Sequence, residues 1–403
     1  MLRARIVPKS HCLHLVAHGK FTCIAPTGML FPVSALQLAQ TPPAGLIELH
    51  PDWPSLRLCR YAPGHASVMC FVNVKGAPNP RCWCPRSLLA GVLGDTKELY
   101  NLEFLAGFEV EFVLLDSALK VPTSVDPIVS WSMTAGLRND TLTALEEICG
   151  ILEASNIHVQ EFHTEGPFQL EIATGPLRPM EAIDALIYTH ETIKHVFSRR
   201  NLRATMAPNA WLTGPKTGAH LHLSMDPLES ENSFLAGMLE HLHVISAFSL
   251  PNYDSFTRVQ DFTNGAGTWV CWGTQNRDVP VRKIENGHWE LRCIDATANF
   301  YLVVFLLLSA GLRGLREGRE LMLQDFLEFP TNVKKAELAE LGIKKHLPTS
   351  MREAIEILKA DRNIDQFIGE DLKREYVRLK EVDQVALGSM SDEERRQCFV
   401  QIF

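Results

Sequence analysis

The segment 286–302, NGHWELRCIDATANFYL, constrains the fold of this 403-residue chain more than any other stretch. Successive side chains of a strand point to opposite faces, so Glu290 and Arg292 share one face of a short strand. The strand leads through Asp295 into an apolar helix over residues 298–312. A carboxylate and a guanidinium in an apolar strand are costly to bury without partners. We therefore expect this face to hold a metal ion and an anionic ligand.

Three other segments repeat this design, with charged or imidazole groups at positions i and i+2 of an apolar strand. The paired residues are Glu109 and Glu111, Gln169 and Glu171, and His220 and His222, the last pair followed by Ser224. Each pattern alone also fits a solvated strand face or a histidine with ordinary polar partners. Together they predict one sheet whose polar face carries a funnel of metal ligands.

Composition narrows the class of protein. Hydrophobic residues make up 46% of the chain and charged residues 21%, which is typical of a globular protein. The net charge of −8 with no basic block argues against a nucleic-acid partner. The longest apolar run, 300–312, is too short to span a membrane. The N-terminus shows no signal peptide, and ten scattered cysteines fit reduced thiols, so we expect a cytoplasmic protein.

The chain divides into two regions of different pattern. Residues 1–95 predict a small, mainly β domain, with strand candidates at 4–7, 11–16, 21–26 and 67–74. Residues 96–403 predict a larger domain in which strands alternate with long helices. The expected helices cover residues 140–155, 179–200 and 231–247, with further amphipathic helices over 334–403. The fold class expected from this order is α+β.

The candidate ligands are mostly hard oxygen donors with one imidazole: Glu109, Glu111, Glu171, Glu290 and His220. This mixture suits Mg²⁺ or Mn²⁺ better than zinc, and the number of carboxylates indicates more than one ion. Four arginines accompany them in the sequence: Arg258, Arg277, Arg282 and Arg292. Divalent ions beside guanidinium groups suit phosphoryl transfer, because both offset the charge of the transferred group.

These motifs resemble those of the glutamine synthetase family over nearly the whole chain. The most specific are G-A-H-L-H-L-S at 218–224 and E-x-R-x-x-D-x-x-x-N-x-Y-L at 290–302. Weaker ones are E-V-E-F at 109–112, Q-L-E at 169–171 and N-R followed by Arg282. The residues of segment 272–292 are most similar to those of the fungal FluG-type members.

The resemblance implies a β-grasp N-terminal domain and a glutamine synthetase/guanidino kinase-like catalytic domain, with an antiparallel sheet funnel surrounded by helices. It also implies a homo-oligomeric double ring, in which a neighbour completes each active site. The implied chemistry uses ATP to phosphorylate the side-chain carboxylate of glutamate, and ammonia or an amine then displaces phosphate to give an amide. Such an enzyme belongs to nitrogen metabolism.

The resemblance also implies roles for individual residues. The metal at the nucleotide phosphates would be held by Glu109, His220 and Glu290. The metal at the substrate would be held by Glu111, Glu171 and a third group, for which we favour Glu165 and keep His163 as the alternative. The residues that would bind the substrate are Arg258, Arg292 and Gly218. The residues that would bind the nucleotide are His222, Ser224, Arg277 and Arg282. Arg258, Arg277 and Arg292 would act in catalysis.

The chain departs from the family at the groups that usually bind ammonium. No glutamate follows Arg258 in 259–269, where Asp261 is the only acid, and 31–45 lacks the aspartate-bearing latch. Pro215-Lys216 replaces the usual Asn-Gly. An ammonium ion needs anionic or carbonyl partners in a closed pocket, so an organic amine fits at least as well as ammonia. Trp269 and Trp272 either line a site for such an amine or pack beneath the flap, the segment after Arg258 that closes over the site in the family.

The sequence therefore predicts an ATP- and Mg²⁺- or Mn²⁺-dependent ligase that joins a carboxylate to an amine through an acyl phosphate. A catalytically weak scaffold with a regulatory or developmental role is the alternative, favoured by the missing acids and opposed by the intact nucleotide-side motifs. A phosphotransferase resembling the guanidino kinases is a third reading, and it requires a phosphorylated product that leaves intact.

Overall fold

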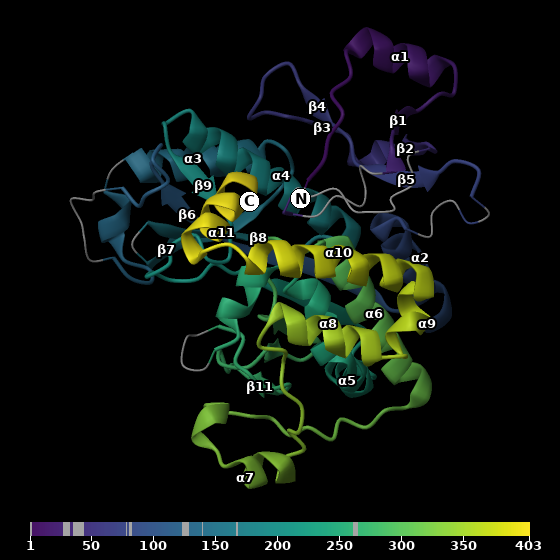
Figure 1. Cartoon of the computed structure of the whole chain (residues 1–403), viewed down its shortest axis with the longest axis vertical. Coiled ribbons are helices and arrows are strands. Elements are labelled where there is room, and N and C mark those ends of the chain that lie inside the picture. The colour runs from purple at the N-terminus through teal and green to yellow at the C-terminus, as the bar shows by residue number, and fades with distance from the viewer. Residues whose placement is uncertain are drawn as a thin grey trace.

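The computed structural model of the chain describes most of the sequence. The described residues are 2–26, 33–34, 44–77, 79, 83–122, 129–138, 140–166, 168–260 and 265–403. The α+β fold class is confirmed, since helices surround one large sheet (Figure 1). No helix in these described ranges is long and apolar enough to cross a membrane. The described cysteines are free thiols, and Cys82 lies outside the described residues.

The N-terminal region holds a small antiparallel sheet. Its strands are β1 (Thr22–Ile24), β2 (Ile47–Pro51) and β5 (Cys70–Val74), in that order, beside a β3 (Arg57–Leu58) and β4 (Ala66–Ser67) hairpin. The strand predicted at 11–16 is wrong, because this run lies in helix α1 (Lys9–Ala17). Pro8 precedes the helix and favours a helix start there. Residues 4–7 form no strand either.

The central sheet carries the strands predicted to hold the site. Its order is β11–β12–β13–β10–β6–β8–β7, with β9 also paired to β6, and only β11 and β12 run parallel. The strands are β6 (Glu103–Leu115), β7 (Val159–Gly166), β8 (Gln169–Thr174), β9 (Arg203–Thr205), β10 (Leu221–Asp226), β11 (Trp272–Thr274), β12 (Val281–Glu285) and β13 (His288–Leu291). Strand β6 lies in the middle and pairs with β10, β8 and β9.

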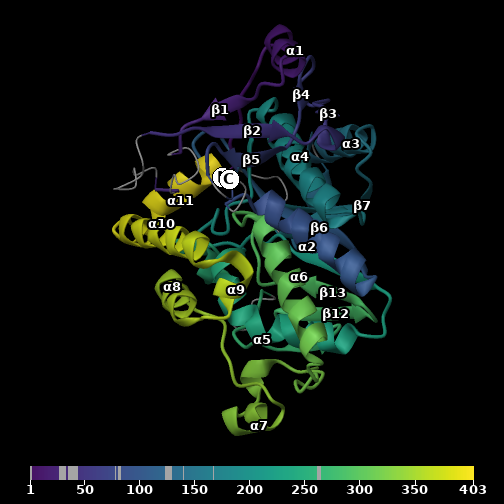
Figure 2. The same cartoon turned by 90° about the vertical axis from the view of Figure 1, so that its right-hand side faces the viewer.

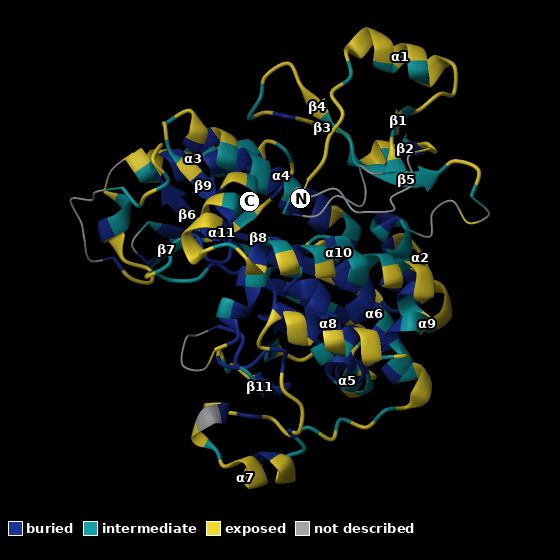
Figure 3. Cartoon of the chain, viewed as in Figure 1, coloured by how far each residue is buried: buried dark blue, intermediate teal, exposed yellow. Residues whose placement is uncertain are grey.

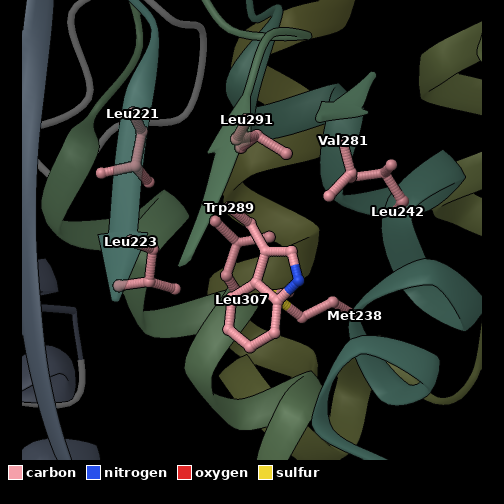
Figure 4. A pocket seen from close by; sticks show the side chains of 8 residues that line it. All are labelled: Leu221, Leu223, Met238, Leu242, Val281, Trp289, Leu291 and Leu307. Atoms are coloured by element: carbon pink, nitrogen blue, oxygen red, sulfur yellow. The ribbon is translucent and has the colours of Figure 1, made fainter. Parts of the chain in front are cut away.

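One face of this sheet is apolar and packs on two helices, α5 (Glu231–Ser249) and α6 (Phe300–Glu317). Leu221 and Leu223 of β10 and Trp289 of β13 point toward these helices, where they meet Met238 and Leu307 (Figure 4). The small cavity between them has no polar lining, so it is a packing gap rather than a substrate site. Alternation then directs the histidines and glutamates of the same strands to the opposite face.

The remaining helices enclose the sheet. They are α2 (Pro85–Tyr100), α3 (Asp140–Glu153), α4 (Pro179–Ser198), α7 (Lys335–Glu340), α8 (Met351–Ala360), α9 (Ile364–Ile368), α10 (Glu370–Gly388) and α11 (Asp392–Ile402). Figure 2 shows α6 beside β12 and β13, and Figure 3 shows that α6 is largely buried whereas α1 is exposed. The predicted boundary near residue 95 falls inside α2, and the division into a β-grasp domain and a catalytic domain stays a prediction.

A buried arginine joins the N-terminal sheet to the helices. Arg86, in the first turn of α2, donates to both carboxylate oxygens of Asp184 in α4 and to the Tyr301 hydroxyl, 2.9 Å away in α6. It also donates to Asp52, which directly follows β2. Arg86 is 4% exposed and Asp184 6%, so the pair depends on its own contacts rather than on water.

We expect Arg86→Met to lower the free energy of unfolding by about 3–5 kcal/mol, because it leaves the buried Asp184 without its cation. Urea unfolding followed by circular dichroism measures the change. The matched control is Arg374→Met, which removes an arginine that is 62% exposed and paired with Asp371, and which should change the free energy of unfolding far less. Equal effects of the two substitutions would contradict the structural role of Arg86.

Candidate functional site

The pairing of β6, β8 and β7 lines up three ionisable side chains. Glu111 lies opposite Glu171 in the β6–β8 ladder, and Glu171 lies opposite His163 in the β8–β7 ladder. Directly opposed residues point to the same face, with Cβ atoms about 5 Å apart. The three residues therefore form one row across the sheet.

A second row runs in the other direction from β6. His222 of β10 pairs with Gly107 of β6 on one side and with Glu290 of β13 on the other, and Glu290 pairs with Arg282 of β12. Glu109 follows Gly107 by two residues and so shares its face. The two rows meet on β6, where Glu109 and Glu111 lie, and this places all four predicted motifs on one polar face.

Glu109 is the centre of the first ligand group. Its Oε2 lies 2.7 Å from Nδ1 of His220, and its Oε1 lies 3.0 Å from Nε2 of His222. Glu290 completes the group, with Oε1 3.2 Å from Nδ1 of His220. Ligand atoms of Glu109, His222 and Glu290 all lie within 4.8 Å of one another, which is the spacing expected around one cation. His222, assigned from sequence to the nucleotide, is thus a second candidate ligand beside His220.

His163 is the centre of the second ligand group. Its Nδ1 lies 3.2 Å from Glu165 and its Nε2 lies 3.3 Å from Glu171. Ligand atoms of these three residues also lie within 4.8 Å of one another. Glu111 lies in the same row, but it accepts a 2.9 Å hydrogen bond from the side chain of Gln169. The structure brings both alternatives for the third ligand, Glu165 and His163, into this group.

Burial and neighbouring charges shift the pKa values of these carboxylates. Burial, together with the charges of Glu111 and Glu171, raises the pKa of Glu165 to about 8. Burial also raises the pKa of Glu171 to about 7, although its hydrogen bond with His163 acts in the opposite direction. Burial would raise the pKa of Glu109 as well, but hydrogen bonds with His220 and His222 hold it well below its usual range. A divalent cation would relieve this crowding, and the oxygen-rich donor set fits one.

Two arginines border the first group. Arg282 donates from Nη1 to Oε2 of Glu290 over 2.9 Å, and Arg292 pairs with the other oxygen of Glu290. The backbone carbonyl of Arg277 accepts a 3.0 Å hydrogen bond from Nε of Arg292. Arg277 itself is exposed at the rim of this group. Two guanidinium groups thus lie beside Glu290, and the predicted roles of the arginines toward a phosphoryl group stay predictions.

Arg258 is buried and bonded to the backbone. It is 4% exposed and donates to the backbone carbonyls of Thr217, at 3.1 Å, and Ile294, at 2.9 Å. It thereby braces the segment before β10 against the segment after β13. A Cβ on Gly218 would lie 2.4 Å from Arg258 and 2.7 Å from Glu111, so glycine is needed for this close approach. The substrate-binding roles of Arg258 and Gly218 stay predictions.

One residue near the site was missed from sequence. His288 lies in β13 two positions before Glu290, on the same face, and its Nε2 is 3.1 Å from Nδ1 of His222. The signal was the same i, i+2 alternation that singled out Glu290 and Arg292. Ser224, opposite His288 in the β10–β13 ladder, ends this line of polar residues.

The two tryptophans considered for an amine site are buried. Trp269 and Trp272 are each 9% exposed; Trp269 packs on His346 and the indole N–H of Trp272 donates to the carbonyl of Leu323. Their burial favours the packing interpretation over direct contact with an amine. Asp261 and most of 31–45 lie outside the described residues; within that stretch, the backbone N–H groups of 33–34 donate to Asp383 of α10.

Comparison with known proteins identifies the family to which the chain is similar. Residues 82–397 match the family model described as glutamine synthetase, catalytic domain. Protein fluG of Emericella nidulans is 34% identical over 79% of this chain, and the chain spans only 38% of the length of that relative. The gamma-glutamylpolyamine synthetase GlnA3 of Streptomyces coelicolor is 26% identical, over 81% of this chain and 74% of its own.

A solved structure shares the fold. The complex of GmaS with ADP superposes with a TM-score of 0.83 at 22% identity, covering 98% of this chain and 93% of its own. At this level of identity the likeness establishes the fold alone.

We expect the affinity for Mn²⁺ to rise between pH 6 and pH 8.5, as measured by isothermal titration calorimetry. A carboxylate whose pKa is raised holds a proton at low pH, and the ion must displace it to bind. Glu165 and Glu171, with pKa values near 8 and 7, therefore bind the ion more readily as pH rises. Each displaced proton contributes up to about tenfold in affinity per pH unit.

Glu165→Gln is the matched control, since it keeps the side-chain shape and removes one titrating group. It should bind Mn²⁺ more weakly and with a flatter dependence on pH. An affinity of the unaltered protein that does not change with pH would contradict the assignment of these carboxylates as ligands.

Proposed function

Because this chain belongs to the glutamine synthetase family of carbon–nitrogen ligases, we propose that it uses ATP to join the side-chain carboxylate of glutamate or a related acid to an amine. One observation carries the proposal. The strand pairings gather two groups of ligand residues on one sheet face, with Arg282 and Arg292 beside the first. A nucleotide and an acid bound side by side require such an arrangement.

The proposed reaction has two steps. An oxygen of the acid's side-chain carboxylate attacks the γ-phosphorus of ATP, the bond to the bridging oxygen breaks, and ADP leaves. The amine nitrogen then attacks the acyl carbon, the bond to phosphate breaks, and the amine gives up a proton. Mg²⁺ or Mn²⁺, when bound, supplies positive charge to the phosphates and the acyl phosphate.

The residues of the chain have distinct parts in this scheme. Glu109, Glu290 and the histidines beside them would hold the nucleotide-side ion, and Glu165, Glu171 and their neighbours the substrate-side ion. Arg277, whose side chain is exposed, would offset charge on the phosphoryl group as it moves. Arg282 and Arg292 hold Glu290 in position, because both contact its carboxylate.

The amine is the least constrained substrate. In the sequence, the acids that would accompany an ammonium ion are missing after Arg258 and in the latch segment. One relative is named for joining glutamate to polyamines, which supports an organic amine as the acceptor. We therefore propose an organic amine, with ammonia as the competing nucleophile.

Phosphate release from ATP is the decisive measurement. It is followed with Mg²⁺ or Mn²⁺ and glutamate, with ammonium, hydroxylamine, putrescine, spermidine and ethanolamine added in turn. We expect amine-dependent release, and Glu290→Ala should reduce it at least 100-fold, because that side chain belongs to the first ligand group and contacts two arginines. His158→Gln, which alters a histidine that is 71% exposed, is the control and should leave the rate unchanged.

The outcomes separate the candidate functions. Release with ammonium alone would make ammonia the nucleophile. The scaffold alternative is favoured by the missing acids, and it requires a folded protein that binds ATP yet releases no phosphate with any acid or amine. A stable phosphorylated product would instead indicate a phosphotransferase.

We also propose that the protein is a cytoplasmic homo-oligomer, arranged as a double ring. Support comes from apolar side chains exposed in the N-terminal region: Leu13 is 59% exposed, Val16 53% and Leu58 66%. Such side chains are commonly covered by a second chain. Sedimentation velocity should show an assembly many times the 45.2 kDa of one chain, and a monomer at micromolar concentration would contradict it.

A further inference from the structure

We propose that His163 is a direct ligand of the substrate-side ion, and that this nitrogen donor makes the site prefer transition ions such as Co²⁺ and Mn²⁺ over Mg²⁺. The inference rests on the proposed function only for the position of the substrate. It adds the identity of one ligand and the choice of ion, and both can be tested without turnover.

The first support is the position of the imidazole. His163 lies opposite Glu171 in the β7–β8 ladder, so both side chains point to the polar face. Its two ring nitrogens lie 3.2 Å and 3.3 Å from carboxylate oxygens of Glu165 and Glu171. The ring is 15% exposed and meets Trp131 edge to face, with ring centres 5.8 Å apart. Packing and pairing thus hold the ring between the two carboxylates.

The second support is that Glu111 already has partners outside the group formed by His163, Glu165 and Glu171. One of its oxygens accepts the hydrogen bond from Gln169, and the other lies 3.7 Å from Nε2 of His220, toward the first ligand group. A Cβ added at Gly218 would lie 2.7 Å from Glu111 and 2.4 Å from Arg258, so these two side chains lie side by side next to Gly218. One oxygen of Glu111 is therefore already hydrogen-bonded, and the ligand atoms that lie within 4.8 Å of one another belong to His163, Glu165 and Glu171. The three remaining donors are one nitrogen and two carboxylates.

Such a donor set has a predictable preference. Mg²⁺ favours oxygen ligands and keeps several waters, whereas imidazole binds first-row transition ions well. For one nitrogen–oxygen site the affinity of these ions rises from Mn²⁺ to Co²⁺. We therefore expect the order Co²⁺, Mn²⁺, Mg²⁺ at this site. An all-carboxylate site would reduce the gap between Co²⁺ and Mg²⁺.

The test measures binding of Co²⁺, Mn²⁺ and Mg²⁺ to the full chain by isothermal titration calorimetry, without nucleotide or acid. His163→Glu supplies a carboxylate in place of the imidazole and should lower the ratio of Co²⁺ to Mg²⁺ affinity at least tenfold. His163→Gln should weaken Co²⁺ more than Mg²⁺. His158→Gln, in the exposed turn before β7, is the matched control and should leave both affinities unchanged.

Visible absorption of bound Co²⁺ provides a second readout, because the spectrum changes when a nitrogen ligand is lost. It should differ between the unaltered protein and His163→Gln, and not between the unaltered protein and His158→Gln. His222→Gln, which alters the first group, should change the spectrum independently, so that the double variant shows the sum of both changes.

Two results would overturn the inference: an unchanged affinity ratio in His163→Glu, or an unchanged Co²⁺ spectrum in His163→Gln, each with an unaltered circular dichroism spectrum. Failure of the proposed function is recognised separately. The protein could show the expected ion preference and yet release no phosphate with any acid and amine. That result would support the metal site and contradict the proposed ligase activity.

Discussion

The crowding of carboxylates on one buried face of a sheet is the constraint on which the rest of the structure depends. Glu111, Glu171 and Glu290 are each at most 7% exposed, and Glu109 lies among them. Like charges this close are tolerated only where cations and hydrogen-bond donors surround them. The imidazoles, Gln169 and the arginines are those partners, and the apolar reverse face anchors the strands on α5 and α6.

Much of the site follows from alternation along single strands. The i, i+2 pattern correctly placed Glu109 with Glu111, His220 with His222, and Glu290 with the following arginine on one polar face. It could not reveal which residues oppose one another, because register depends on pairing between strands distant in sequence. The sequence therefore left Glu165 and His163 as alternatives, whereas the β7–β8 ladder brings both to Glu171.

The errors have physical causes as well. The run at 11–16 has strand-forming residues, but a strand needs a partner edge, and this segment follows Pro8 into a helix on the surface. The substrate-binding role of Arg258 stays a prediction, but the sequence did not reveal that its side chain also donates to backbone carbonyls of two segments. Such contacts depend on loop geometry, which no pattern of residue types records.

Strand β6 carries one carboxylate toward each ligand group, Glu109 and Glu111, two residues apart on one continuous strand. Their Cα atoms are therefore separated by about 7 Å, a distance fixed by the backbone rather than by side-chain choice. Under the proposed function, this backbone distance would set the spacing between the nucleotide-side ion and the substrate-side ion. Changes in substrate preference within this architecture must then arise in the loops around the sheet, because shifting either anchor along β6 would displace the other.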